Sequence, residues 1–147
     1  MIRKFKENDI EKVMKIWLES NISAHSFIDE SYWRDNFEMV KCAISEANLY
    51  IYEENNNIKG FAGVVDGYIA GIFVEENSRS KGIGGKILKK VKENYSELIL
   101  SVYEKNKKAI RFYEKEGFNP VEHKIDDGTG EAEVIMKWMM EPVKQKQ

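Results

Sequence analysis

Residues 78–86, with the sequence SRSKGIGGK, combine three glycines with positively charged side chains. An apolar run from Tyr68 to Val74 leads into this stretch, and a helical pattern from Gly84 to Tyr95 leads out of it. The first turn of a helix carries unpaired N–H groups and the positive end of the peptide dipoles. Glycines let that backbone approach a ligand because no Cβ intervenes. Since Arg79 and Lys81 add full charges, the sequence predicts an anion site suited to a phosphate.

Two common phosphate loops do not fit this stretch. A P-loop requires a glycine, four residues and then Gly-Lys-Ser/Thr, whereas Ser80 replaces that glycine and Ile87 follows Lys86. A dinucleotide fingerprint requires a third glycine at the position of Ile87 and follows the first strand of its fold. The pattern that remains is Arg-x-x-Gly-x-Gly, from Arg79 to Gly84. Taken alone, it is also compatible with a plain strand-to-helix turn.

A second pattern, EKNKKAIRFYEKEGF at residues 104–118, predicts a helix that Gly117 ends. It directly follows a buried run at residues 98–102, which a right-handed crossover places parallel to residues 68–74. The apolar positions of this helix, which taken alone are ordinary core residues, are Ala109, Phe112 and Tyr113.

The other elements follow from hydrophobic periodicity. Strands are predicted at residues 2–5, 49–52, 58–65, 118–125 and 131–138, and a helix is predicted from Asn8 to an end between Asn21 and Ser26. A second helix begins near Asp29 or Ser31, with a core stripe of Trp33, Phe37, Val40 and Ile44. Cys42 is expected to be a small core residue, because nothing near it lowers a thiol pKa. The predicted order is β-α-α-β-β-β-α-β-α-β-β, an α/β fold with a mixed sheet.

Bulk composition excludes several classes of protein. The chain has 147 residues, and 42% of them are hydrophobic. Its net charge of −2 does not indicate a basic surface, so we expect no nucleic-acid partner. No apolar run reaches the ~20 residues that cross a bilayer, so no membrane partner is expected. One cysteine leaves no internal disulfide and no metal cluster. We expect a cytoplasmic protein with one domain at residues 1–140 and a polar tail at 141–147.

Taken together, the two patterns resemble the GNAT family, the Gcn5-related N-acetyltransferases. Arg79 to Gly84 is similar to the acyl-CoA loop of that family, and residues 104–118 are similar to its Asn-x-x-Ala-x-x-Phe-Tyr-x-x-x-Gly-Phe segment. Residues 17–20, 24–28 and 32–35 also resemble the small bacterial YiaC-like branch, so the resemblance covers nearly the whole chain. The element order above is that of the GNAT fold.

The resemblance implies direct transfer of an acetyl group from acetyl-CoA to a primary amine, without a covalent enzyme intermediate or a metal. The amine would belong to a protein lysine, a protein N-terminus or a small molecule. The implied coenzyme A contacts are Ile72, Phe73, Val74, Arg79, Ser80, Lys81, Gly82, Ile83, Gly84, Gly85, Asn106 and Ala109.

Tyr113 is the predicted general acid, because a phenol can pass a proton to a departing thiolate; a packed structural tyrosine is the alternative. The residues expected to meet the acceptor are His25, Phe27, Tyr32, Tyr68, Glu75 and Glu104. The general base stays open among His25, Tyr68, Glu75, Glu104 and a chain of water molecules, although a histidine has the most suitable unperturbed pKa.

A catalytically silent acyl-CoA sensor on the same fold is the competing interpretation. Tyr113 favours an enzyme, because a binding module needs no proton donor. The acceptor, the acyl-chain length and the choice between monomer and homodimer stay open from the sequence.

Overall fold

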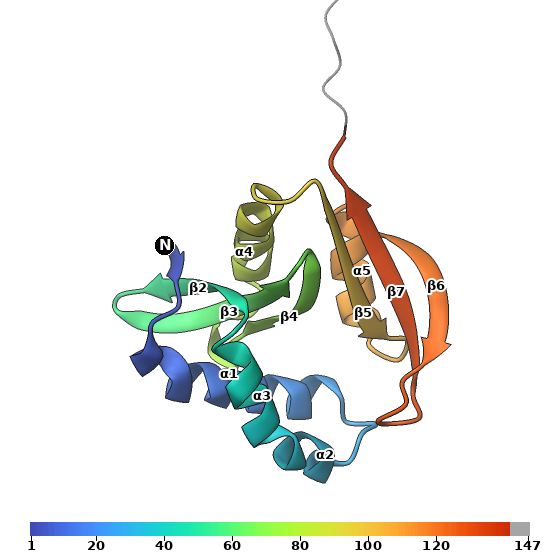
Figure 1. Ribbon diagram of the computed structural model, residues 1–147, viewed down its shortest axis with the longest axis horizontal. Helices are drawn as coiled ribbons and strands as arrows, with labels where there is room; N and C mark the ends of the chain where they lie inside the picture. The colour runs from blue at the N-terminus through green and yellow to red at the C-terminus, as the bar shows by residue number, and fades with distance from the viewer. Residues whose placement is uncertain (142–147) are drawn as a thin grey trace, which may run out of the picture.

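The computed structural model describes residues 1–141, so the predicted tail lies, from residue 142 onward, outside the described residues. One seven-stranded sheet runs through the molecule in the order β1-β2-β3-β4-β5-β7-β6 (Figure 1). The strands are β1 (Ile2–Lys4), β2 (Asn48–Glu54), β3 (Asn57–Val65), β4 (Tyr68–Val74), β5 (Glu97–Tyr103), β6 (Asn119–Ile125) and β7 (Ala132–Met139).

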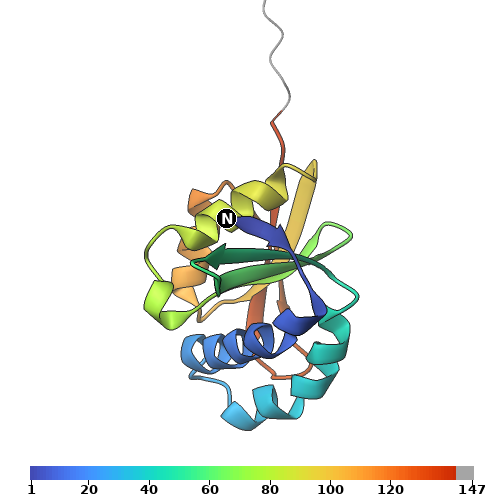
Figure 2. The same ribbon diagram turned by 90° about the vertical axis from the view of Figure 1, so that its left-hand side faces the viewer.

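Helices cover both faces of this sheet. Helices α1 to α3 pack together against one face, and α4 lies on the opposite face (Figures 1 and 2). A buried cluster joins α4 and α5 to β4, β5 and β7, and a second cluster joins α1 to α3 to β2 and β3. The helices are α1 (Ile10–Ala24), α2 (Glu30–Asp35), α3 (Phe37–Ile44), α4 (Ile83–Lys92) and α5 (Lys107–Lys115), with short 3₁₀ turns η1 (Glu7–Asp9) and η2 (Glu76–Ser78).

The mixed α/β fold and its predicted element order are confirmed, with differences at three places. The second predicted helix is broken at Asn36, whose side-chain amide donates to the carbonyl of Tyr32 at 2.7 Å and so turns the chain between α2 and α3. The helix after the glycine loop ends at Lys92 rather than at residue 95. The expectation that Cys42 is a core residue is wrong, because its side chain is exposed on α3.

The feature that positions the site is the short contact between β4 and β5. These parallel strands pair only at Tyr68 with Ile99 and at Ile69 with Leu100. Beyond those pairs, β4 pairs only with β3 and β5 pairs only with β7, so the ladder between the two strands stops; we call this gap in the ladder the slot. In Figure 1, β2 to β4 fan away from β5 to β7 at this place. Ala70 has no partner in the β3 register, which marks a bulge in β4 where the slot begins.

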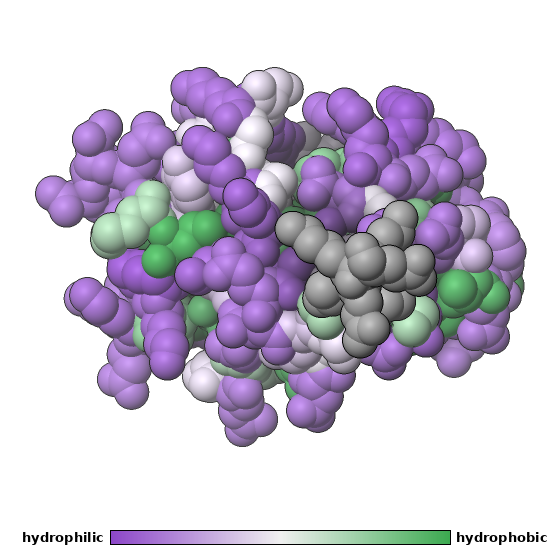
Figure 3. Space-filling model, turned by 90° about the horizontal axis from the view of Figure 1, so that it is seen from above, coloured by the Kyte–Doolittle hydropathy of each residue, from purple (hydrophilic) through white to green (hydrophobic). Residues whose placement is uncertain are grey.

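No helix within residues 1–141 is long and apolar enough to span a membrane. The same residues hold no group of three or more His, Cys, Asp or Glu side chains that could bind a metal ion. Seen from above, the surface is mostly hydrophilic, with small separate hydrophobic areas (Figure 3).

Gly60→Ala tests how closely β3, β4 and α4 are packed. A Cβ at residue 60 would lie 2.8 Å from the Phe73 carbonyl oxygen, and backbone cannot yield as a side chain can. We expect the substitution to lower the free energy of unfolding by about 1–3 kcal/mol in urea titrations. Gly85→Ala is the control, because its Cβ would meet nothing closer than 3.8 Å and its position is helical. Equal loss in both variants would contradict the packing described.

Candidate active site

The glycine loop has the backbone conformation that exposes amide groups. Ser80 and Gly82 have positive φ angles of 66° and 79°, and Gly82 is the N-cap of α4. The first hydrogen bond of the helix runs from the Lys86 N–H to the Gly82 carbonyl at 3.1 Å. The N–H groups of the residues before Lys86 therefore have no acceptor within the helix. A Cβ on Gly82 would meet no atom within 4 Å, so this part of the loop faces open space.

Arg79 is turned toward α1 rather than outward. Its Nε donates to the Val74 carbonyl at 3.1 Å, and its two terminal nitrogens lie 3.5 and 3.4 Å from the Ser20 and Ser23 hydroxyls. The guanidinium thereby ties the loop to the end of β4 and to the last turns of α1. Lys81 is exposed, so its ammonium group is the free positive charge beside the loop.

The three predicted contacts on β4 do not all present their side chains in the same direction. Ile72 and Val74 pack against the cluster under α4 and α5. Phe73 points the other way, onto Phe61 at a ring distance of 5.1 Å. Phe73 can therefore meet a ligand in the slot only through its backbone.

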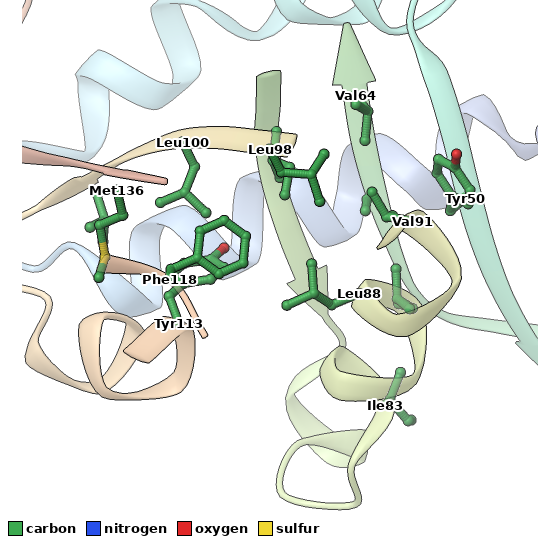
Figure 4. Close-up of a cluster of buried hydrophobic side chains, with 14 of the residues drawn as sticks. Tyr50, Val64, Ile83, Leu88, Val91, Leu98, Leu100, Tyr113, Phe118 and Met136 are labelled. Carbon is green, nitrogen blue, oxygen red and sulfur yellow. The ribbon is translucent and has the colours of Figure 1, made fainter. Parts of the chain in front are cut away.

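Tyr113 reaches from α5 into the core beside the slot. Its ring lies 5.5 Å from that of Phe118, and Leu98 and Leu100 of β5 lie close by (Figure 4). Burial raises the pKa of the phenol above its ordinary value, with a smaller contribution from Tyr68. The hydroxyl therefore stays protonated at neutral pH and is available as a donor.

Asn106 is the N-cap of α5. Its Oδ1 accepts the Ala109 N–H at 3.2 Å, and its Nδ2 lies 3.2 Å from Nε2 of His25. The two predicted cofactor residues of this segment, Asn106 and Ala109, are thus joined to each other, and Asn106 also contacts the connection between α1 and α2.

His25 lies in an aromatic cluster at that connection. Its ring stacks on Trp33 at 5.3 Å and meets the edges of Tyr103 at 5.0 Å and Phe27 at 5.7 Å. Tyr32 joins through Trp33, at a ring distance of 5.0 Å. The structure thus brings together three of the predicted acceptor residues, His25, Phe27 and Tyr32.

The other three predicted acceptor residues lie apart from this cluster. Tyr68 lies at the closed end of the slot, where β4 and β5 pair. Glu75 accepts from Lys12 of α1 at 2.7 Å, and this hydrogen bond lowers the pKa of its carboxyl group. Glu104 contacts Nδ1 of His123 on β6 at 2.7 Å.

Sequence reasoning missed the contributions of Tyr103, Trp33 and Ser20. Tyr103 directly follows the buried run of β5, and its hydroxyl donates to Asp126 in the β6–β7 loop at 2.8 Å. An aromatic residue at the end of the predicted strand could have indicated that Tyr103 contributes to the site. Ser20 is buried on the face of α1 that meets Arg79, and nothing in its local sequence indicates that contact.

A hollow on the described surface lies away from the slot. It measures about 580 Å³ and lies between β1, β2 and the end of α4, lined by residues such as Lys4, Tyr50 and Lys90. It has no glycine loop and no separated strands beside it. We therefore place the site at the slot, where free backbone groups converge.

The buried ring of His25 gives a prediction about pH. Burial lowers the pKa of His25 to about 4, whereas an unfolded histidine titrates near ~6.5. Between these values the unfolded chain binds the extra proton, so the contribution of His25 to the free energy of unfolding falls as the pH is lowered. We expect the ring signals of His25 in NMR spectra to titrate near pH 4. Titration near 6.5 would contradict the burial described.

Comparisons with known proteins agree with this geometry. The acetyltransferase (GNAT) domain model matches residues 45–120. The chain is 34% identical over 140 residues to the peptidyl-lysine N-acetyltransferase YiaC of Escherichia coli, covering 94% of this chain and 96% of YiaC. It is 26% identical over 118 residues to the peptidyl-lysine N-acetyltransferase YjaB of the same organism, covering 80% of each chain.

Two solved structures share the fold. The solution structure of apo YjaB from Escherichia coli has a TM-score of 0.82 at 24% identity and covers 96% of this chain and 98% of that one. The structure of yncA from Salmonella typhimurium, solved with acetyl-CoA, has a TM-score of 0.70 at 15% identity and covers 100% and 97%. With the family match and the relative at 34% identity, they lead to one conclusion. The chain belongs to the GNAT family of acetyl-CoA-dependent N-acetyltransferases.

Proposed function

We propose that the protein acetylates the ε-amino group of lysine side chains in proteins, with acetyl-CoA as the donor. The observation that supports this acceptor is the 34% identity to a peptidyl-lysine N-acetyltransferase across 94% of the chain. Protein N-termini and small amines are the competing acceptors. A silent sensor is disfavoured, because the relatives matched over most of the chain are named as transferases.

The slot suits the chemistry of acetyl-CoA. Its pantetheine arm carries amides, and the unpaired edge of β4 from Gly71 to Val74 offers backbone groups to pair with them. The amide groups from Gly82 to Gly85 and the charge of Lys81 suit the diphosphate. At the bulge, Ala70 lies outside the regular ladder with β3. A backbone N–H there could stabilise negative charge on the thioester carbonyl oxygen.

Overall, an amide C–N bond forms, the thioester C–S bond breaks, the amine loses a proton and coenzyme A leaves as a thiol. We assign Tyr113 as the proton donor to the leaving sulfur. Its side chain comes from α5, which flanks the slot, and its phenol remains protonated at neutral pH. A buried donor acts without competing water, which strengthens its interaction with developing charge.

The proton on the amine needs a different group. The ion pair with Lys12 lowers the pKa of Glu75, which makes this carboxylate a weak base. His25 already contacts Asn106 through Nε2. Among the four candidates, this leaves Tyr68 and Glu104, whose carboxylate contacts only the exposed ring of His123 within residues 1–141, as the side chains to test as proton acceptors.

We also propose that residues 1–140 act as one catalytic domain in the cytoplasm. The relative YiaC matches 94% of this chain over 96% of its own length, which supports one domain. The near-neutral charge and single cysteine support the location.

Tyr113→Phe removes the donor and keeps the ring. We expect kcat for a lysine peptide to fall by about 10²–10⁴, because that is the usual contribution of a positioned acid. Acetyl-CoA affinity, measured by calorimetry, should change little. Phe112→Leu, on the neighbouring position of α5, is the control for packing. Unchanged turnover in Tyr113→Phe would contradict the assignment.

Lys81→Glu reverses the free charge beside the loop. Two unit charges about 4 Å apart interact by ~1 kcal/mol in water, so reversing one changes the interaction by ~2 kcal/mol and should raise KM for acetyl-CoA about thirtyfold. Lys89→Glu makes the same change in the last turn of the same helix, far from the loop, and should leave this KM nearly unchanged. Equal effects in both variants would place the diphosphate elsewhere.

A further inference from the structure

The last turns of α1 and the residue that follows them span the open end of the slot. On the β4 side, Ser20 and Ser23 contact the guanidinium of Arg79 at 3.5 and 3.4 Å. On the β5 side, His25 contacts Asn106 at 3.2 Å. One short segment therefore holds both sides of the slot, through different partners.

The contact between His25 and Asn106 has a defined direction. The Ala109 backbone N–H can only donate, so the Asn106 atom that it contacts at 3.2 Å must be the oxygen. The amide nitrogen of Asn106 then faces His25, and Nε2 of the imidazole must accept. In the neutral ring the hydrogen is therefore on Nδ1. That atom is buried and has no hydrogen-bond partner among residues 1–141, so no competing contact favours the other tautomer.

The ring cannot easily turn away from Asn106. Trp33 stacks on it with an interplanar angle of 27°, and Tyr103 meets its edge at 76°. Tyr103 is itself held, because its hydroxyl donates to Asp126 at 2.8 Å. The acceptor atom Nε2 is thus fixed in place opposite the first turn of α5.

We propose that His25 is a positioning residue: by accepting from Asn106 it fixes the start of α5, and through this helix the hydroxyl of Tyr113, relative to the β4 side of the slot. Tyr113 lies seven residues after Asn106, two turns along the same rigid helix. The inference rests on the proposed role of Tyr113 as acid. It also excludes His25 as the general base, because the lone pair that would take the amine proton is already used.

Two substitutions separate positioning from base catalysis. His25→Gln places a side-chain oxygen near the position of Nε2, so it can still accept from Asn106 but cannot take up a proton at neutral pH. His25→Phe keeps a ring in the cluster but has no acceptor. With a lysine peptide, we expect His25→Phe to lower kcat tenfold or more, because small displacements of catalytic groups are costly. His25→Gln should stay within about threefold of wild type, with KM for acetyl-CoA unchanged.

Equal losses of kcat in the two variants would overturn the proposal and indicate that His25 is the general base. Full activity in His25→Phe would also overturn it, because the ring would then only fill space in the aromatic cluster. Thermal unfolding of both variants controls for misfolding.

Long-range ¹H–¹⁵N NMR of the wild type gives a readout that needs no turnover: we expect Nδ1 to be protonated and Nε2 not. A hydrogen on Nε2 instead of Nδ1 would refute the contact with Asn106. If Nδ1 carries the hydrogen but the enzyme acetylates no lysine peptide, only the proposed function is refuted.

Discussion

The structure depends on the short ladder between β4 and β5, which has only two residue pairs. Two residue pairs hold the two halves of the sheet together, and beyond them the strands separate. A parallel sheet normally continues its ladder, because unpaired backbone groups are costly when they are buried. Here the unpaired groups line an opening, at a bulge and beside a glycine loop. A ligand that carries its own amides and a diphosphate can satisfy all of them, which explains why the fold suits acetyl-CoA.

The slot needs support on both sides, and two separate cores provide it. The cluster under α4 and α5 fixes the faces of β4 and β5, while the cluster under α1 to α3 fixes β2 and β3. α1 and the residue that follows it add polar contacts at the open end, from Lys12 to Glu75, from Ser20 to Arg79 and from His25 to Asn106. Each of these contacts joins the N-terminal part of the chain to the end of a strand that borders the slot.

Much of this arrangement could be predicted from local sequence. The glycine loop, the helix from Asn106 and the parallel pair of strands follow from periodicity and from residues with fixed conformational roles, such as Gly82 and Gly117. The direction of long side chains could not be predicted, because it depends on partners far along the chain. Arg79, for example, contacts Ser20 of α1 and the Val74 carbonyl, contacts that the sequence does not indicate, and its role as a phosphate ligand stays a prediction. Cys42 was expected in the core because nothing near it lowers a thiol pKa, yet it lies outside the stripe of Trp33, Phe37, Val40 and Ile44 that packs against the core, and it is exposed.

Binding of coenzyme A at the slot is tested most directly by following backbone amide signals in NMR spectra while coenzyme A is added. The slot predicts shifts and slowed hydrogen exchange at the amides of residues 71–74 and 82–85, which border the separated strands and the loop. The amide signals around the hollow between β1, β2 and the end of α4 should stay unchanged. Shifts confined to that hollow, with the amides of the slot unaffected, would contradict the central claim.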